Sequence, residues 1–239
     1  WASAYSHGHN FILQVTCEGQ VDPVTGMVVN IKDIDDVLKR DIVQVYGQKS
    51  LNDEVDSFAD KAPSIENILL DIKNRLQHLP EGCKLTHLRL EELPDLWAEL
   101  NLKNNTMTIT RSYEFAASHR LHVPTFSEEE NQRLFGKCNN PAGHGHNYVV
   151  EVTVAGEPDE TTGFICDILE IDRVVNEEVV DRYDHKNLNV DLPEFQNKVT
   201  TSEMVVQEIW NRLIDKLPAK LTRVRLCETA RSAFEVTAE

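Results

Sequence analysis

The sequence has no run of about 18 apolar residues, so we expect no transmembrane helix. It has no basic excess either: 40 acidic residues against 24 Lys and Arg give a formal net charge of −16. Residues 1–100 and 101–239 each carry −8 (17 acids with nine bases, and 23 with 15), so the acidity is not a tail. We therefore expect no nucleic-acid partner and no membrane partner. A hydrophobic content of 41% excludes a disordered chain.

Cysteine is scarce, and the pattern of a disulfide framework is missing. The number is odd, the spacings are irregular and there is no CxxC or secretory signal. These absences predict reduced thiols in a cytoplasmic protein. The cysteines are Cys17, Cys83, Cys138, Cys166 and Cys227.

The sequence contains an internal repeat. Residues 7–19 read HGHNFILQVTCEG and residues 144–156 read HGHNYVVEVTVAG. The offset of 137 holds without a gap from 7–76 onto 144–213, with 26 identities in 70 positions. We infer a tandem duplication. A complete unit covers 107–239, and a shortened unit that lacks its beginning covers 1–100.

The second copy gives the order of the elements. Alternating, β-rich segments predict strands over 107–119, 146–157, 221–229 and 232–238. Helical spacing predicts helices near 168–182 and over 202–217, the latter opened by a capping box at Thr200 and Glu203. The order β-β-α-α-β-β indicates an α+β fold. The first copy has the same order without its first strand, and residues 93–106 are expected to connect the copies.

One motif of the second copy is suited to binding a metal ion. His144 and His146 lie two apart on a predicted strand, so their side chains point to the same face. His119, late in the preceding strand, is the natural third ligand. Three histidines with an open position describe a catalytic zinc site. The alternative is that strand histidines satisfy only local hydrogen bonds.

Other residues near these histidines are candidates for general acid/base catalysis. Cys138 lies in a Gly-, Asn- and Pro-rich loop, where a cysteine beside a metal can ionise near neutral pH. Asp184 precedes His185 and could orient its imidazole. Glu228 ends a strand and could accept two hydrogen bonds from an amino-pyrimidinone edge. The plain alternatives are a buried thiol, a surface turn and an ordinary strand-end acid.

Together these motifs resemble the 6-pyruvoyl-tetrahydropterin synthase / 6-carboxy-tetrahydropterin synthase family. The matching segments are FAASHRL (115–121), GKCNNPAGHGHNY (136–148), DETTGF (159–164), DHKNLN (184–189), TTSE (200–203) and RLCET (225–229). The resemblance implies the tunnelling fold (T-fold), in which antiparallel sheets carry helices on one face and units assemble into barrels. It implies a homo-oligomer of six units, which three copies of this chain would supply.

The resemblance also implies the residue roles and the reaction. Zn²⁺ would be held by His119, His144 and His146. Cys138, Asp184 and His185 would be catalytic, and the substrate would be bound by Glu228, Thr201, Ser202 and Glu203. The substrate would be 7,8-dihydroneopterin triphosphate, with Arg120, Lys137 and Lys186 as candidate cations for its triphosphate.

Three alternatives to a tetrahydrobiopterin-forming lyase stay open. The carboxy branch, in the queuosine pathway, would release acetaldehyde. A non-catalytic pterin-binding scaffold is a second possibility, and an aldolase-like activity on dihydroneopterin is a third. The five residues between Cys138 and His144 resemble the biopterin-type enzymes without deciding the branch.

The first copy departs from the pattern. Trp1, Gly47 and Gln48 stand where the second copy has Cys138, Asp184 and His185. Only His7, His9 and Glu92 remain of the candidate set, and the strand that would supply a third histidine is missing. We predict that this copy is catalytically inactive and binds no zinc, and the alternative is a relic metal site that uses His7 and His9.

Overall fold

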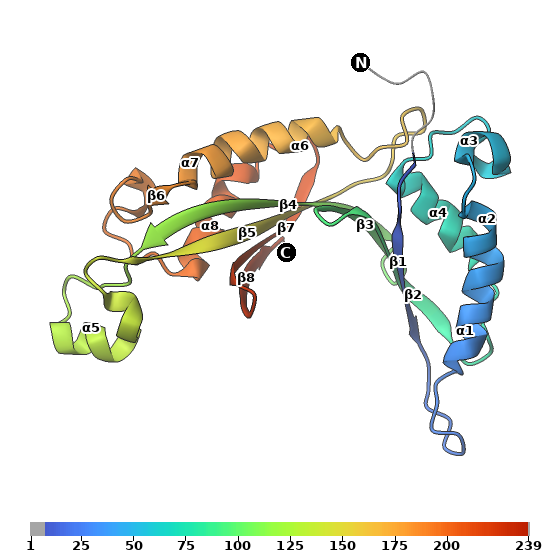
Figure 1. Ribbon diagram of the computed structural model, residues 1–239, viewed down its shortest axis with the longest axis horizontal. Coiled ribbons are helices and arrows are strands. Elements are labelled where there is room, and N and C mark those ends of the chain that lie inside the picture. The colour runs from blue at the N-terminus through green and yellow to red at the C-terminus, as the bar shows by residue number, and fades with distance from the viewer. Residues whose placement is uncertain (1–7, 239) are drawn as a thin grey trace. The chain divides into compact units, whose positions relative to one another are not determined.

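The computed structural model describes residues 8–238. The chain forms two compact units (Figure 1). The first comprises Trp1–Ile109 and Ala155–Cys166, and the second comprises Thr110–Val154 and Asp167–Glu239. One loop of the second repeat, 155–166, therefore folds with the first unit. In the described part of the chain, no helix is long and apolar enough to cross a membrane.

The first unit places helices on one side of antiparallel strands in the order β1-β2-β3. Its β2 strand alternates between buried and partly exposed residues, and Leu88 and Leu90 face inward. Helix α4 covers them with an apolar stripe that includes Leu69 and Ile72. The elements are β1 (Ile12–Glu18), α1 (Ile31–Leu38), a π-helical segment (Lys39–Val43), α2 (Gln44–Tyr46), α3 (Leu51–Glu54), a 3₁₀ turn (Asp56–Phe58), α4 (Ile65–Arg75), β2 (Lys84–Leu93) and β3 (Leu96–Asn101).

The second unit has strand order β4-β5-β7-β8, and the short β6 pairs in parallel with β4. Tyr148, Val150, Val152 and Val154 of β5 are almost fully buried at every second position. The elements are β4 (Thr106–His119), α5 (Glu128–Phe135), a 3₁₀ turn (Gly136–Asn139), β5 (His144–Ala155), α6 (Ile168–Val175), a π-helical segment (Asn176–Val180), α7 (Asp181–Tyr183), β6 (Lys186–Asn187), a 3₁₀ turn (Pro193–Phe195), α8 (Ser202–Leu213), β7 (Lys220–Thr229) and β8 (Ser232–Thr237). Figure 1 shows α6 and α7 along one side of β4 and β5.

Two expectations about local structure are wrong. Residues 93–106 are not merely a connection, because 96–101 form β3, which pairs with β2. The capping box at Thr200 and Glu203 is not made: α8 begins at Ser202, and its N-cap residue Thr201 makes no side-chain cap bond. A capping box occurs instead at α5, where Ser127 and Glu130 bond each other's backbone N–H.

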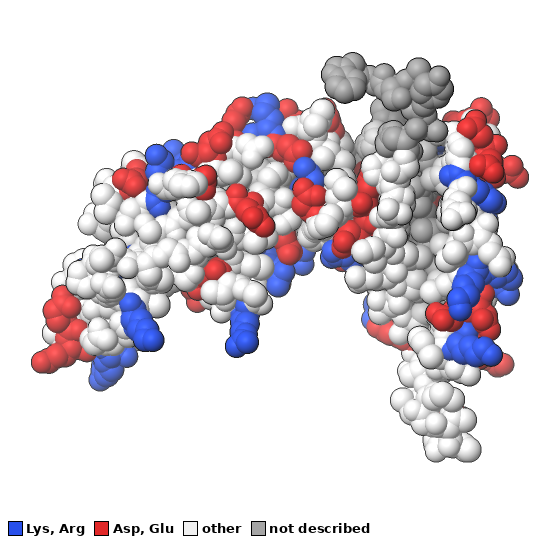
Figure 2. Space-filling view, viewed as in Figure 1, with Lys and Arg blue, Asp and Glu red and all other residues white. Residues whose placement is uncertain are grey.

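The net negative charge is dispersed over the surface. Figure 2 shows acidic and basic side chains intermixed on the visible face. Several pairs sit one helical turn apart, such as Arg173 with Glu170 and Glu177. Such exposed pairs contribute little to stability. The charged surface therefore does not mark a functional site.

Candidate active site

Three histidines of the second unit meet at the ends of two strands. His119 is the last residue of β4, and His144 and His146 begin β5. Their candidate ligand atoms all lie within 4.8 Å of one another. The structure therefore brings together the three residues that the i, i+2 spacing and the preceding strand predicted.

The hydrogen bonding of the three rings fits a metal ion. His119 is 1% exposed, and its Nδ1 lies 2.8 Å from the Thr200 carbonyl oxygen, which assigns the N–H to Nδ1 and leaves the Nε2 lone pair free. His119 Nε2 lies 3.1 Å from His144 Nε2, close to the separation of about 3.3 Å expected for two nitrogens on one tetrahedral zinc. Among the described residues, the buried atoms His144 Nδ1 and His146 Nε2 have no hydrogen-bond partner.

The protonation of these rings favours the same conclusion. Burial lowers the pKa of His119 and that of His144 below the usual histidine value. The neutral imidazole that this favours is the form that binds a metal. The three histidines thus fit a metal ion by position, by tautomer and by charge.

A carboxylate lies next to the histidines. Glu228 Oε1, on β7, is 3.7 Å from both His119 Nε2 and His146 Nε2. The same oxygen accepts a 2.9 Å hydrogen bond from Ser202 Oγ, which is buried at the start of α8. Ser202 therefore fixes the Glu228 carboxylate beside the metal-type cluster, and sequence reasoning did not foresee this bond.

Cys138 lies in a 3₁₀ turn that is braced from β4. The Cys138 carbonyl accepts a hydrogen bond of 2.9 Å from the Leu121 N–H. Arg120 donates to the backbone oxygen of the next residue, Asn139, at 2.9 Å, and to its side-chain Oδ1 at 3.0 Å. His122 Nδ1 lies 2.9 Å from the same Oδ1. Arg120 is therefore engaged in holding the turn that carries Cys138.

Tyr148 is a residue of this site that sequence reasoning did not assign a role. It is fully buried, and its hydroxyl has no hydrogen-bond partner among the described residues. Burial, and then the charges of Glu228 and Cys138, raise its pKa well above the usual tyrosine value. Its ring lies next to that of His146, with the two ring centroids 5.5 Å apart, so Tyr148 borders the three-histidine cluster. The sequence could have indicated this position, because Tyr148 follows His146 by two residues and so lies on the same face of the strand.

Asp184 and His185 form a hydrogen-bonded pair on an exposed corner. Asp184 Oδ2 lies 2.7 Å from His185 Nδ1, and its Oδ1 accepts from the Ala116 N–H at 2.8 Å. The hydrogen bond from Ala116, followed by that from His185, lowers the pKa of Asp184. His185 has φ of 58°, and its side chain is 84% exposed. The pair therefore has the geometry of a carboxylate that orients a solvent-facing imidazole.

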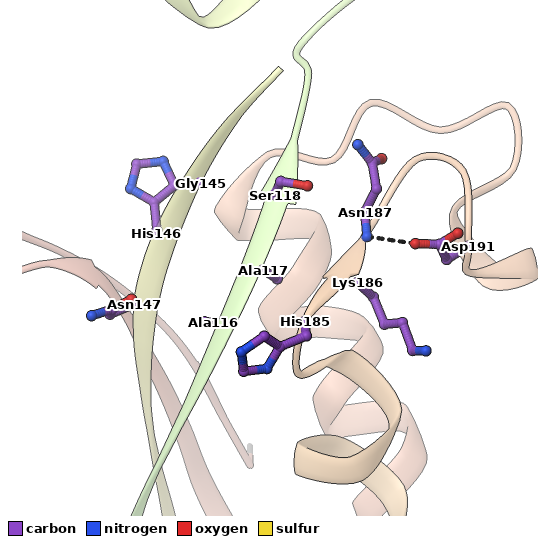
Figure 3. A pocket seen from close by; sticks show the side chains of 10 residues that line it. All are labelled: Ala116, Ala117, Ser118, Gly145, His146, Asn147, His185, Lys186, Asn187 and Asp191. Carbon is purple, nitrogen blue, oxygen red and sulfur yellow. Dashed lines mark hydrogen bonds between the residues drawn. The ribbon is translucent and has the colours of Figure 1, made fainter. Parts of the chain in front are cut away.

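His185 and His146 line one open pocket of about 480 Å³. Figure 3 shows His185 and Lys186 on one side of the Ala116–Ser118 strand and His146 on the neighbouring strand. The turn that follows β6 is held by a 2.8 Å hydrogen bond from the Asn187 N–H to Asp191 Oδ2. The pocket thus has one member of the three-histidine cluster, His146, and one member of the Asp184–His185 pair, His185, in its lining.

Of the predicted site residues and candidate cations, His146, His185 and Lys186 line this pocket, and the others do not. Thr201 is the N-cap of α8, and the exposed Glu203 makes no hydrogen bond within the described part of the chain. Neither Lys137 nor Arg120 lines the pocket, whereas Lys186 does. The structure therefore brings Ser202, but not Glu203, to the metal-type cluster.

The first copy keeps the shape of these elements without their chemistry. Gln48 has φ of 58°, as His185 does, but its side chain carries no acid/base function. His9 pairs with Glu92 at 3.2 Å, and His7 and Trp1 lie outside the described residues. Within 8–238, the described part of the chain, the three-histidine cluster is the single group suited to a metal.

The chain is similar to known proteins of one family. The family model "6-pyruvoyl tetrahydropterin synthase" matches residues 2–103 and again 108–239. The human 6-pyruvoyl tetrahydrobiopterin synthase is 46% identical over 122 residues, which cover 51% of this chain and 84% of that protein. The Drosophila melanogaster enzyme of the same name is 44% identical over 126 residues, covering 52% and 75%.

A solved structure supports the fold. The 6-pyruvoyl tetrahydropterin synthase of Caenorhabditis elegans is 37% identical and superposes with a TM-score of 0.53, covering 56% of this chain and 96% of that one. A chain with antiparallel strands, helices on one side and two family matches is a tandem T-fold protein of the α+β class. The protein belongs to the 6-pyruvoyl tetrahydropterin synthase family, and its relatives make it an enzyme of this type.

Proposed function

We propose that the second copy catalyses the zinc-dependent conversion of 7,8-dihydroneopterin triphosphate to 6-pyruvoyl-tetrahydropterin, with release of triphosphate. The observation that carries the proposal is the cluster of His119, His144 and His146, of which His146 lines the same pocket as His185. The names of the 44–46% identical relatives support the pyruvoyl product. We also propose that the enzyme is cytoplasmic and homo-oligomeric.

The metal would supply Lewis acidity at the hydroxyl groups of the substrate side chain. The residues around it would bind the pterin and transfer protons. Glu228, held by Ser202, would accept hydrogen bonds from the amino-pyrimidinone edge of the pterin. This anchor would set the position of the side chain relative to the three histidines.

Proton transfer would fall to two groups, one on each face of the substrate side chain. The Cys138 thiolate would move a proton on one face of the side chain. On the other face, His185 would take or return a proton at Nε2, because its Nδ1 is bonded to Asp184. The braced 3₁₀ turn would keep the sulfur in place during these steps.

Lys186 is the best candidate for a cation that holds the triphosphate. It lines the pocket beside His185, and no ion pair of the described residues engages its ammonium group. Arg120, another candidate from the sequence, is engaged by Asn139. The proposal therefore assigns phosphate binding to Lys186 and positioning of the Cys138 turn to Arg120.

One alternative product has specific support. A putative 6-carboxy-5,6,7,8-tetrahydropterin synthase of Archaeoglobus fulgidus is 38% identical over 85 residues, covering 36% of this chain and 67% of that protein. Such an enzyme would release triphosphate and also cleave the side chain, with loss of acetaldehyde. A pterin-binding scaffold without catalysis is the remaining alternative.

Product analysis by mass spectrometry distinguishes the proposed reaction from these two alternatives. Purified, zinc-loaded protein is incubated with 7,8-dihydroneopterin triphosphate, with Cys138→Ala as the matched inactive variant. We expect 6-pyruvoyl-tetrahydropterin and triphosphate from the wild type, and a large loss of both from the variant. The carboxy product with acetaldehyde would support the alternative branch, and unchanged substrate would support the scaffold.

A further inference from the structure

Two cysteines of the first unit are in contact with each other. Cys17 lies near the end of β1, and Cys83 directly precedes β2. The Cys17 S–H donates a hydrogen bond to the Cys83 sulfur. The two strands are antiparallel neighbours, and both residues belong to the first unit (Figure 1). The first unit therefore contains a pair of thiols and not two isolated ones.

The register of the two strands explains this contact. Glu18 is paired with Lys84, so the same register continued by one residue places Gly19 opposite Cys83. Residues opposite each other point to one face of a sheet, and so do Cys17 and Gly19, which are two apart on one strand. The two thiols therefore lie on the same face. Because Gly19 has no side chain, no side chain opposite Cys83 separates it from Cys17.

The backbones of the two segments also approach each other closely at this place. The register shifts between Thr16 and Cys17, and such a bulge increases the local twist and re-aims the side chains beside it. A Cβ on Gly19 would clash with the carbonyl oxygen of Gly82. A disulfide bond requires two chain segments to lie close together, and the end of β1 and the turn before β2 meet this requirement.

The surroundings of Cys17 favour its protonated form. Burial, followed by the hydrogen bond to Cys83 and the charge of a Cys83 thiolate, raises the pKa of the Cys17 thiol. The second and third of these causes depend on the Cys83 sulfur being free, and they disappear when that sulfur is bonded to another sulfur. A modification of Cys83 therefore makes Cys17 a better nucleophile.

The second repeat has no thiol at either position. At the offset of 137, Val154 corresponds to Cys17. After the one-residue slip between the repeats, Ala219 corresponds to Cys83. Val154 is fully buried on β5, and β5 is a neighbour of β7, the strand that Ala219 precedes. The same unit is thus built with two apolar residues at these positions, so packing alone does not account for the thiol pair.

We propose that Cys17 and Cys83 form a reversible disulfide bond when the protein is exposed to a low-molecular-weight disulfide such as oxidised glutathione. The Cys83 thiolate attacks one sulfur of the small disulfide and forms a mixed disulfide. The small thiolate that leaves takes up the proton that Cys83 released. Cys17 then loses its proton and attacks the Cys83 sulfur, and the second small thiolate leaves and takes up that proton. The two protein thiols are oxidised, and the small disulfide is reduced to two thiols.

The bond would restrain the helical layer of the first unit. Residues 18–82, which lie between the two cysteines, contain α1 to α4. Closing such a long loop reduces the conformational freedom of the unfolded chain and so stabilises the folded one. We therefore expect the oxidised first copy to be more stable than the reduced one. This effect does not depend on the reaction proposed for the second copy.

Titration of the purified chain with mixtures of reduced and oxidised glutathione tests the pairing. The remaining thiols are alkylated, and the protein is digested and analysed by mass spectrometry. We expect two peptides joined through Cys17 and Cys83, with a ratio of oxidised to reduced protein that falls with the square of the reduced glutathione concentration. Glutathione attached to Cys83 alone, with a first-power dependence, would overturn the proposal. A link from either residue to a different cysteine would also overturn it.

Two variants taken from the second repeat locate the effect. Cys17→Val and Cys83→Ala introduce the residues that the second repeat has at these positions. We expect oxidation to raise the melting temperature of the wild type by roughly 4–16 °C, and dithiothreitol to reverse the rise. Neither variant should respond. Cys227→Ala, which removes a thiol of β7 in the second unit, is the matched control and should respond as the wild type does. An equal rise in Cys17→Val and in the wild type would refute the proposal. Because no readout is enzymatic, this result is separate from that of the product analysis.

Discussion

Replacing Arg120 by Met should loosen the turn that carries Cys138 while leaving the three histidines in place. The guanidinium group makes two hydrogen bonds to Asn139, one to its backbone oxygen and one to its side chain. Met keeps the length of the side chain and removes both donors. Asn139 is 3% exposed, so water cannot readily replace them.

The size of the effect follows from the exposure of both partners. A hydrogen bond from a charged donor contributes about 1.5–3 kcal/mol when buried. The Arg120 side chain is 26% exposed, which discounts the two bonds to a total of about 2–3 kcal/mol. For a chain of this size, such a loss lowers the melting temperature by roughly 4–12 °C. We also expect a fall in kcat larger than any rise in KM, because the sulfur is no longer held.

Thermal unfolding and alkylation of Cys138, followed by peptide mass spectrometry, measure these effects. Arg133→Met is the matched control, since Arg133 is exposed on the neighbouring α5. We expect faster alkylation of Cys138 and a lower melting temperature in Arg120→Met alone. If both variants melt alike and Arg120→Met raises only KM, then Arg120 binds the triphosphate and the reasoning about the turn is refuted.

Three further predictions concern the site and the first unit. Ser202→Ala removes the hydrogen bond to Glu228 and should raise KM about tenfold in steady-state assays, and an unchanged KM would contradict the anchoring role. Burial raises the pKa of Glu66, so its protonated form favours folding at acid pH and this contribution is lost as pH rises through its folded pKa. Glu66→Gln should therefore stabilise the protein at pH 7 and lose this advantage towards pH 4 in denaturant titrations, whereas a pH-independent difference would oppose the cause given. Zinc at 100 times its dissociation constant should add about 2.7 kcal/mol, so chelation should lower the melting temperature of the wild type but not of His146→Ala.

Most of the fold could be predicted because the repeat and the strand period are local signals. Tyr148 to Val154 alternate as a strand with one buried face requires, and α4 and α8 carry apolar stripes. Helix α5 was missed because its eight residues are mostly polar and show no apolar period. Strand β3 is implied by the order of the repeat but was not located, because Leu96–Asn101 is short and adjoins a polar segment that looked like a linker. The boundaries 1–100 and 107–239 stay a prediction about the repeats, since the compact units exchange residues 155–166.

The site was predictable where it depends on spacing and not where it depends on tertiary contacts. His144 and His146 share a face because they are two apart, and His119 joins them because β4 and β5 are neighbours. The bond from Ser202 to Glu228 links residues 26 apart on a helix and a strand, which no local pattern reveals. Likewise, the burial of Glu66 comes from a loop 99 residues away. Residues at matching positions of the two repeats can therefore differ in burial and in hydrogen bonding, because these tertiary contacts differ between the repeats.

Metal analysis of the purified chain tests the central claim most directly, namely that one metal-dependent site lies in the second copy. We predict one zinc ion per chain by inductively coupled plasma mass spectrometry, and its loss in His144→Ala but not in His9→Ala. Two ions per chain, no ion, or an ion that persists in His144→Ala would contradict the account.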